Sequence, residues 1–424
     1  MKQQIIISNI FGGKAPSQYF QSEGQFSHSI GIDPDLPISD AVGDRETSGM
    51  LRPSGYASFD GANVNANPYW ILTSPKTALI YAILNNGRLI SYSSSFASET
   101  LIDTATTSSG NGGIYYNNYI YIGANTNISR YGPLDGTPTL TNSVWTGATL
   151  GSQTALVNTT YPSIRGSGVL PNHVMHVHTD NKLYVCDYDS TCSTVANRGK
   201  GLIHYIRTTF STTEGTGNDG STYNALDLSL GYMPTCLESY GNLLVIGAIP
   251  AGSNVTLTQG KAALFFWDTL AASFVAVVYL PDPLVTALKN VNGRLHVFTG
   301  ALSTGTDVSN GYRVSVYVGG NRIEQVYYSN TGSPPLAGAV DSFGDRVVWG
   351  TFERLPTTTG ASPNYYGVVM AYGSKDNRFP AGVHCIINST AAATAADGLV
   401  TAVKNVQQAS FSYPRFVVGW RDAA

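Results

Sequence analysis

The chain has 424 residues, a formal net charge of −3 and charged side chains at only 12 % of its positions. This length is ample for one large domain, and the small number of Lys, Arg and Glu residues argues against a helical protein. The same shortage of basic residues argues against sequence-specific binding of a nucleic acid. Because no apolar run approaches about 20 residues, we also expect no membrane insertion.

Residues 1–69 contain many turn-forming residues and few regular strand patterns, and they are predicted to form an extended arm. An apolar cluster lies near its start, outside any strand repeat, and comprises Ile5, Ile6, Ile7, Ile10 and Phe11. A cluster of this kind would promote aggregation if it stayed exposed, so we expect another surface to cover it. Gly12-Gly13 and Pro16 separate it from the rest of the chain, which favours a neighbouring subunit as that surface.

From residue 70 onward, one strand–turn–strand unit recurs along the chain. Its turns contain Asn-Gly and related pairs, which supply the positive φ that tight hairpins require. The turn residues are Asn86, Gly87, Asn117, Asn118, Asp180, Asn181, Gly241, Asn242, Asn292, Gly293, Gly344 and Asp345. A weaker seventh copy spans Tyr413–Trp420, and Val285–Asn292 matches Val400–Gln407 at six of eight positions.

Two further strands follow most of these hairpins, and four antiparallel strands in about 50 residues are typical of a β-propeller blade. The seven copies predict a β-propeller over residues 70–424 with seven four-stranded blades. Six blades are the alternative, because the first two copies are only about 31 residues apart. The last unit, Leu399–Trp420, has only two strands, so we expect N-terminal strands within residues 24–59 to complete it and close the ring.

Sequence motifs give little support for catalysis. His173, His176 and His178 cannot all share one face of a strand, so a structural interpretation is favoured over a metal site. Thr216–Tyr223 resembles a degraded Asp-box of sialidase-type propellers, but such boxes are structural. No acid–nucleophile pair with convergent arginines can be located. We therefore predict no enzymatic activity, no metal and no cofactor, with a propeller glycosidase or lyase as the weaker alternative.

The 26 tyrosines leave a second kind of function open. Tyrosine rings are rigid apolar faces with a polar tip, and they can stack on sugar rings as well as pack across a sheet. A receptor- or glycan-binding propeller is therefore an alternative to a structural protein.

The order of the N-terminal segments resembles the tail-nozzle and related tail-tube proteins of tailed bacteriophages. Those proteins begin with a short strand and a Gly-Gly segment, here within Asn9–Tyr19, and a Gly-Leu-x-x-Arg-Pro-Gly-like step then leads into a propeller. Leu51-Arg52-Pro53 matches that step, although Ser54 stands before Gly55. The resemblance implies a structural virion protein that is assembled in the host cytoplasm. It also implies a homo-oligomeric ring at the tail or portal vertex, in contact with other virion proteins.

Overall fold

The computed structural model of the protein describes the ring of strands and two short pairs of strands outside it. The described residues are 32–37, 48–50, 68–93, 98–102, 112–124, 127–146, 163–164, 168–169, 173–189, 200–206, 222–228, 231–250, 261–300, 311–330, 332–354, 365–373, 382–386, 399–406 and 415–420. Within these residues, the helical structure is a single short 3-10 turn at Ala337–Ala339, and no helix is long and apolar enough to cross a membrane.

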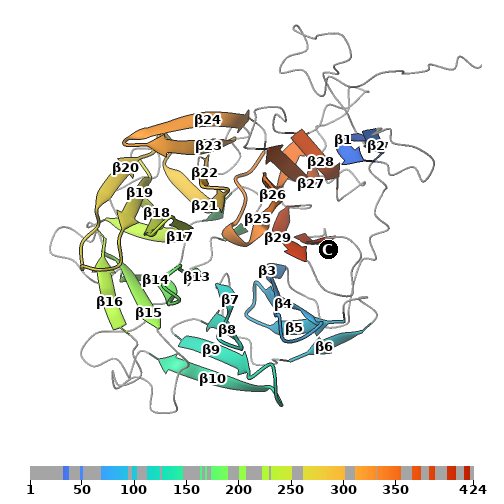
Figure 1. Ribbon diagram of the computed structural model, residues 1–424, viewed down its shortest axis with the longest axis vertical. Helices are drawn as coiled ribbons and strands as arrows, with labels where there is room; N and C mark the ends of the chain where they lie inside the picture. Colours follow the sequence, from blue (N-terminus) through green and yellow to red (C-terminus); the bar gives the residue numbers. More distant parts are fainter. Residues whose placement is uncertain are drawn as a thin grey trace, which may run out of the picture.

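Six four-stranded antiparallel sheets form a ring (Figure 1). Blade 1 consists of β3 (Pro68–Thr73), β4 (Ile80–Leu84), β5 (Leu89–Tyr92) and β6 (Glu99–Leu101), and blade 2 of β7 (Gly113–Tyr116), β8 (Tyr119–Ala124), β9 (Asn127–Gly132) and β10 (Thr139–Thr146). Blade 3 consists of β13 (Met175–Val177), β14 (Leu183–Asp189), β15 (Lys200–Ile206) and β16 (Thr222–Asp227), and blade 4 of β17 (Tyr232–Tyr240), β18 (Leu243–Pro250), β19 (Ala263–Trp267) and β20 (Ala276–Tyr279). Blade 5 consists of β21 (Leu284–Val291), β22 (Arg294–Gly300), β23 (Tyr312–Gly319) and β24 (Arg322–Ser329), and blade 6 of β25 (Val340–Phe343), β26 (Arg346–Arg354), β27 (Tyr365–Gly373) and β28 (Gly382–Ile386).

The predicted β-propeller is therefore confirmed, and its six four-stranded blades agree with the alternative count. Seven four-stranded blades are not confirmed. The last repeat forms a two-stranded sheet of β29 (Val400–Val406) and β30 (Arg415–Trp420) among the described residues. This sheet lies between blade 6 and blade 1, where β29 contacts β25, β26 and β3.

The predicted closure by N-terminal strands differs from the pairing in the described residues. β1 (Ile32–Pro37) and β2 (Ser48–Met50) pair with each other, whereas β29 and β30 form their own sheet. Pro34 and Pro37 leave β1 without two backbone donors, and the register of the pair shifts between Asp33 and Pro37. Such a strand is poorly suited to extend another sheet. Another two short strands, β11 (Ser163–Ile164) and β12 (Gly168–Val169), also pair only with each other.

The first strand of each sheet is its inner strand. In ring order, the contacts run from β3 to β7, β13, β17, β21, β25, β29 and back to β3. This order explains the short spacing between the first two sequence copies. Asn86-Gly87 connects the second and third strands of blade 1, whereas Asn117-Asn118 connects the first and second strands of blade 2. The two copies therefore occupy different places in their blades.

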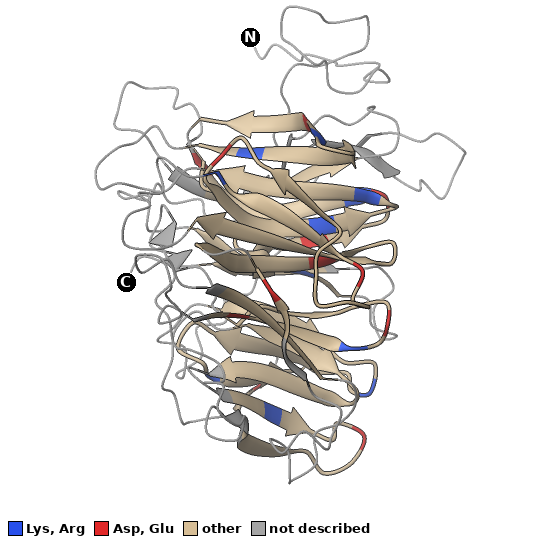
Figure 2. Cartoon of the chain, turned by 90° about the vertical axis from the view of Figure 1, so that its left-hand side faces the viewer, with Lys and Arg blue, Asp and Glu red and all other residues tan. Residues whose placement is uncertain are grey.

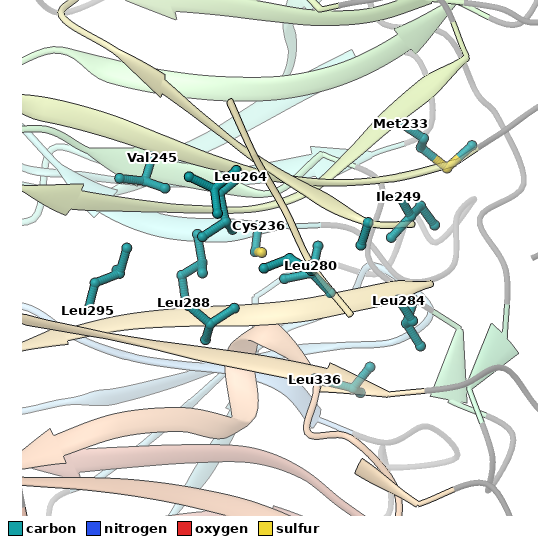
Figure 3. Close-up of a cluster of buried hydrophobic side chains, with 14 of the residues drawn as sticks. Met233, Cys236, Val245, Ile249, Leu264, Leu280, Leu284, Leu288, Leu295 and Leu336 are labelled. Carbon is teal, nitrogen blue, oxygen red and sulfur yellow. The ribbon is translucent and has the colours of Figure 1, made fainter. Parts of the chain in front are cut away.

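The core lies between neighbouring sheets and not inside any one of them. The largest cluster joins blades 4 and 5, where Leu264 and Val245 of blade 4 pack with Leu288 and Leu295 of blade 5 (Figure 3). Similar clusters lie between the other adjacent sheets. Each of these sheets carries apolar residues on both faces, and stacking the sheets around a ring buries both faces of each sheet.

The ring closes where β29 meets β3. The hydroxyl of Thr401 donates to the backbone oxygen of Pro68 at 2.6 Å, which joins residues 333 positions apart in the chain. Ala402 and Val406 of β29 pack on Ile71 and Ile80 of blade 1. Gly419 of β30 is also required at this junction, because a Cβ atom there would overlap the ring of Pro68.

Candidate functional site

Four charged residues occupy matching positions on successive inner strands, with acids and lysines in alternation. They are Glu238 on β17, Lys289 on β21, Asp341 on β25 and Lys404 on β29, and we call them the inner-strand belt. Lys289 Nζ lies 3.2 Å from one oxygen of Asp341, and Lys404 Nζ lies 3.1 Å from the other. The carboxylate of Asp341 is therefore shared by the two lysines that flank it.

The next position on each of these strands carries a second alternation, of Ser and Asn. Asn290 Nδ2 donates to the backbone oxygen of Ser239 at 2.9 Å, and Asn405 Nδ2 donates to that of Ser342 at 3.0 Å. An acid–Ser pair on one sheet thus faces a Lys–Asn pair on the next, and this arrangement occurs twice. The inner-strand belt and these amide bonds together fix the register of neighbouring sheets.

The ionisation of the belt follows from burial and from charge pairing. Burial raises the pKa of Glu238 to about 7, although the Lys289 ammonium opposes this shift. Burial would also raise the pKa of Asp341, but Lys404 and Lys289 outweigh it and hold that pKa below its usual value. For Lys289, Glu238 and Asp341 overcome the effect of burial and raise its pKa. Asp341 and the two lysines satisfy one another's charges, which is the behaviour of a structural network, whereas Glu238 is partly protonated near neutral pH.

The three histidines singled out in the sequence are divided between two places. His176 Nε2 and His178 Nδ1 each lie 2.8 Å from the hydroxyl of Ser239, next to the belt. Burial, with smaller contributions from Lys289 and His178, lowers the pKa of His176 to about 3. His173 lies beside Asp187, with Nδ1 3.3 Å from the backbone oxygen of Cys186 and 3.9 Å from Asp187 Oδ1.

A buried histidine–carboxylate pair lies inside blade 3. His204 Nε2 is 3.2 Å from Asp187 Oδ2, and both side chains are almost completely buried. The backbone N–H of Tyr188 donates to the other carboxylate oxygen. Among the described residues, no group of three His, Cys, Asp or Glu side chains is arranged to hold a metal ion. The pair is enclosed within its own blade, where it joins β14 to β15.

The predicted hairpin residues lie in turns between neighbouring strands, and most of them have positive φ angles. Positive φ angles occur at Gly87 (83°), Asn117 (43°), Asn118 (71°), Asn181 (60°), Gly241 (60°), Asn292 (51°), Gly293 (78°) and Gly344 (58°). Asn86, Asp180, Asn242 and Asp345 lie in the same turns. Asn86 Oδ1 accepts from the backbone N–H of Arg88, and Asp180 Oδ1 accepts from that of Lys182. The arm residues Ile5, Ile6, Ile7, Ile10 and Phe11 and the Asp-box-like segment Thr216–Ser221 lie outside the described residues.

Exposed large hydrophobic side chains lie on β20 of blade 4, on β23 and β24 of blade 5 and on the loop between β19 and β20. In the described part of the chain, they are Leu270, Val275, Tyr279, Val318 and Tyr328, with 44 to 89 % of each side chain exposed. We call this surface the apolar rim. Residues 269–281, which include β20, contain no charged side chain. Figure 2 shows the ring from the side of β20, where most of each strand is tan and charged residues occur at scattered positions.

A shallow hollow of about 590 Å³ lies at the turn ends of blades 1, 2 and 3, whereas the apolar rim lies on blades 4 and 5. Its lining comes mainly from the β7–β8 turn, with contributions from neighbouring loops.

Sequence reasoning identified the hairpin turns but missed the inner-strand belt. The signal was present, because the matching segments Val285–Asn292 and Val400–Gln407 contain the Lys–Asn pair at equal positions. What the sequence could not provide was the acidic strand that lies between them in the ring.

Comparison with known proteins gives no family for this chain. No family model matches it, and no curated protein matches it. Among solved structures, a computationally designed protein named Ika8 aligns with a TM-score of 0.44 and 14 % identity, over 84 % of this chain and 94 % of the designed chain. The extracellular domain of the putative one component system BT4673 from B. thetaiotaomicron aligns with a TM-score of 0.43 and 11 % identity, over 85 % of this chain and 45 % of that chain. At these values, neither similarity transfers a function.

Proposed function

We propose that the protein is a non-catalytic structural propeller of a tailed-phage virion, which assembles with further copies of itself into a ring. The observation that carries this proposal is the apolar rim. All of the exposed large hydrophobic side chains in the described part of the chain lie on two adjacent blades. A surface of this kind is typical of a site that another protein covers.

The outer strand of blade 4 is suited to accept a further strand. β20 pairs with β19 on one side only, and no described strand pairs with its other edge. Edge strands usually carry charges or prolines that prevent pairing. β24 of blade 5 does so with Arg322 and Glu324, whereas β20 contains only Ala, Val and Tyr.

The occupant that we propose for this edge is the N-terminal arm of a neighbouring copy. Its segment Gln3–Phe11 contains no charged residue and includes five large apolar side chains, which matches the uncharged edge. Addition of this segment as a strand would supply backbone hydrogen bonds and cover the part of the apolar rim that lies beside β20. At about 1.5–3 kcal/mol for each large side chain, burial of the five would contribute roughly 8–15 kcal/mol before the costs of ordering.

Substitutions at the exposed rim test this proposal without disturbing the core. We expect the double variant Val275→Lys/Tyr279→Lys to remain folded but to lose self-assembly, because two ammonium groups would oppose an added apolar strand. Sedimentation velocity across a range of concentrations measures the loss. Deletion of residues 1–12 should produce the same loss while the thermal transition stays unchanged.

The matched control is Thr139→Lys/Thr141→Lys, on the exposed outer strand of blade 2. This variant adds the same charge on an outer strand that contributes no residue to the apolar rim, so its assembly should equal that of the unmodified protein. Normal assembly of the rim variant, or an equal loss in the control, would show that the rim is not the docking surface.

A further inference from the structure

The hollow at the turn ends of blades 1 to 3 has the chemistry of a ligand site. Its lining residues include Tyr115, Val177, Asn117, Asn118 and Asn181. Lys76 and Asp135 lie at its edge, and both are exposed. The lining therefore combines apolar area with several groups that can both donate and accept hydrogen bonds.

The base of the hollow is held by contacts between loops of different strands and blades. The hydroxyl of Tyr116 donates to the backbone oxygen of Asn181 at 2.7 Å, which joins the β7–β8 turn to the β13–β14 turn. The backbone N–H of Leu134 donates to the oxygen of Asn118 at 2.9 Å, which joins the same turn to the β9–β10 loop. A surface fixed in this way can bind a ligand without first ordering itself.

The side chains of the β7–β8 turn are unusual for their backbone conformation. Asn117 and Asn118 both have positive φ, with values of 43° and 71°. Glycine meets this requirement with less strain, and Gly293 occupies the second position in the corresponding turn of blade 5. Asn118 Oδ1 is buried and has no hydrogen-bond partner among the described residues. Because this oxygen is enclosed by protein, the exposed amides that the hollow offers to a ligand are those of Asn117 and Asn181.

The balance of charges and amides selects one class of ligand. Lys76 and Asp135 contribute one charge of each sign, so the lining offers no net attraction to a phosphate or a polyanion. A sugar hydroxyl both donates and accepts hydrogen bonds at its oxygen. An Asn amide can pair with it in either way, because its NH₂ group donates and its oxygen accepts. The apolar face of a pyranose ring can pack on a tyrosine, and Tyr115 is partly exposed in the hollow. We propose that this hollow binds a neutral oligosaccharide, an activity that is separate from assembly through the apolar rim.

Glycine substitutions test this site without breaking its turns. Asn117→Gly/Asn181→Gly removes two amides at positions where φ is already positive, so the turns should form at least as well as before. Maltotriose and N-acetylchitotriose serve as neutral probes, with saturation-transfer difference NMR on the full-length protein as the measurement. We expect at least one trisaccharide to bind, and the double variant to weaken its binding at least fivefold.

Asn292→Gly is the matched control, because Asn292 has a φ of 51° at the first position of the corresponding turn in blade 5. Binding by this variant should equal that of the unmodified protein. Absence of binding by both trisaccharides overturns the proposal, as does binding that Asn117→Gly/Asn181→Gly leaves unchanged. Sedimentation of the same variants should show normal assembly, so failure here is distinguishable from failure of the rim proposal.

Discussion

Glu238 is the residue whose protonation should be visible in the stability of the whole protein. Burial raises the pKa of its carboxyl from 4.5 to about 7. Between these two values, the folded state holds more protons than the unfolded state. The contribution of Glu238 to the free energy of unfolding therefore falls as the pH rises from 4.5 to 7, and stays constant above that window.

Glu238→Gln should remove this dependence, because the amide is neutral at every pH. As the pH rises from 4.5 to 8, we expect the free energy of unfolding of the variant to rise by about 1–3 kcal/mol relative to that of the unmodified protein. This range allows for the partial exposure of Glu238. Urea unfolding at several pH values measures the difference. Glu324→Gln on the exposed part of β24 is the control, and its curve should run parallel to that of the unmodified protein. A parallel curve for Glu238→Gln would contradict the assigned role.

At the scale of the element, one threonine recurs on the inner strands. Thr235 on β17 donates to the backbone oxygen of Val285 on β21 at 2.6 Å, and Thr401 on β29 donates in the same way to Pro68 on β3. Thr286 on β21 occupies the matching position, but its buried hydroxyl has no hydrogen-bond partner among the described residues. Threonine at this position is therefore hydrogen-bonded on β17 and β29 but unpaired on β21.

Thr401→Val should destabilise the protein by about 1–2 kcal/mol, because it removes a buried hydrogen bond and leaves a backbone oxygen unpaired. Thr286→Val replaces an unpaired buried hydroxyl with a methyl group, so it should be neutral or slightly stabilising. Urea unfolding of both variants at neutral pH tests the comparison. Equal effects of the two substitutions would mean that the closing bond contributes nothing to the ring.

The sequence allowed the strands and turns to be predicted because they depend on local chemistry. Asn and Gly tolerate positive φ, so Asn117, Asn292 and Gly344 indicate tight turns, and the structure gives all three a positive φ. The apolar runs between such turns indicate strands. The blade count was harder to predict, because Asn86-Gly87 resembles the other turns but connects different strands. The belt and the hollow depend on contacts between blades, which no local pattern encodes.

For the whole molecule, the described ring closes through β29 and not through strands of the N-terminal arm. Thr401 and Gly419 join the last sheet directly to Pro68 of blade 1. In our proposal, this leaves the apolar cluster of the arm available for a neighbouring copy. The arm and the apolar rim would then be two halves of one interface, which repeats from copy to copy in the manner of a heterologous ring.

The most direct test of this account is the native mass of the full-length protein, measured by native mass spectrometry. The account predicts a single closed assembly whose mass is an integer multiple, greater than one, of the 45.1 kDa chain. A mass of 45.1 kDa at all concentrations, with no larger species, would contradict it.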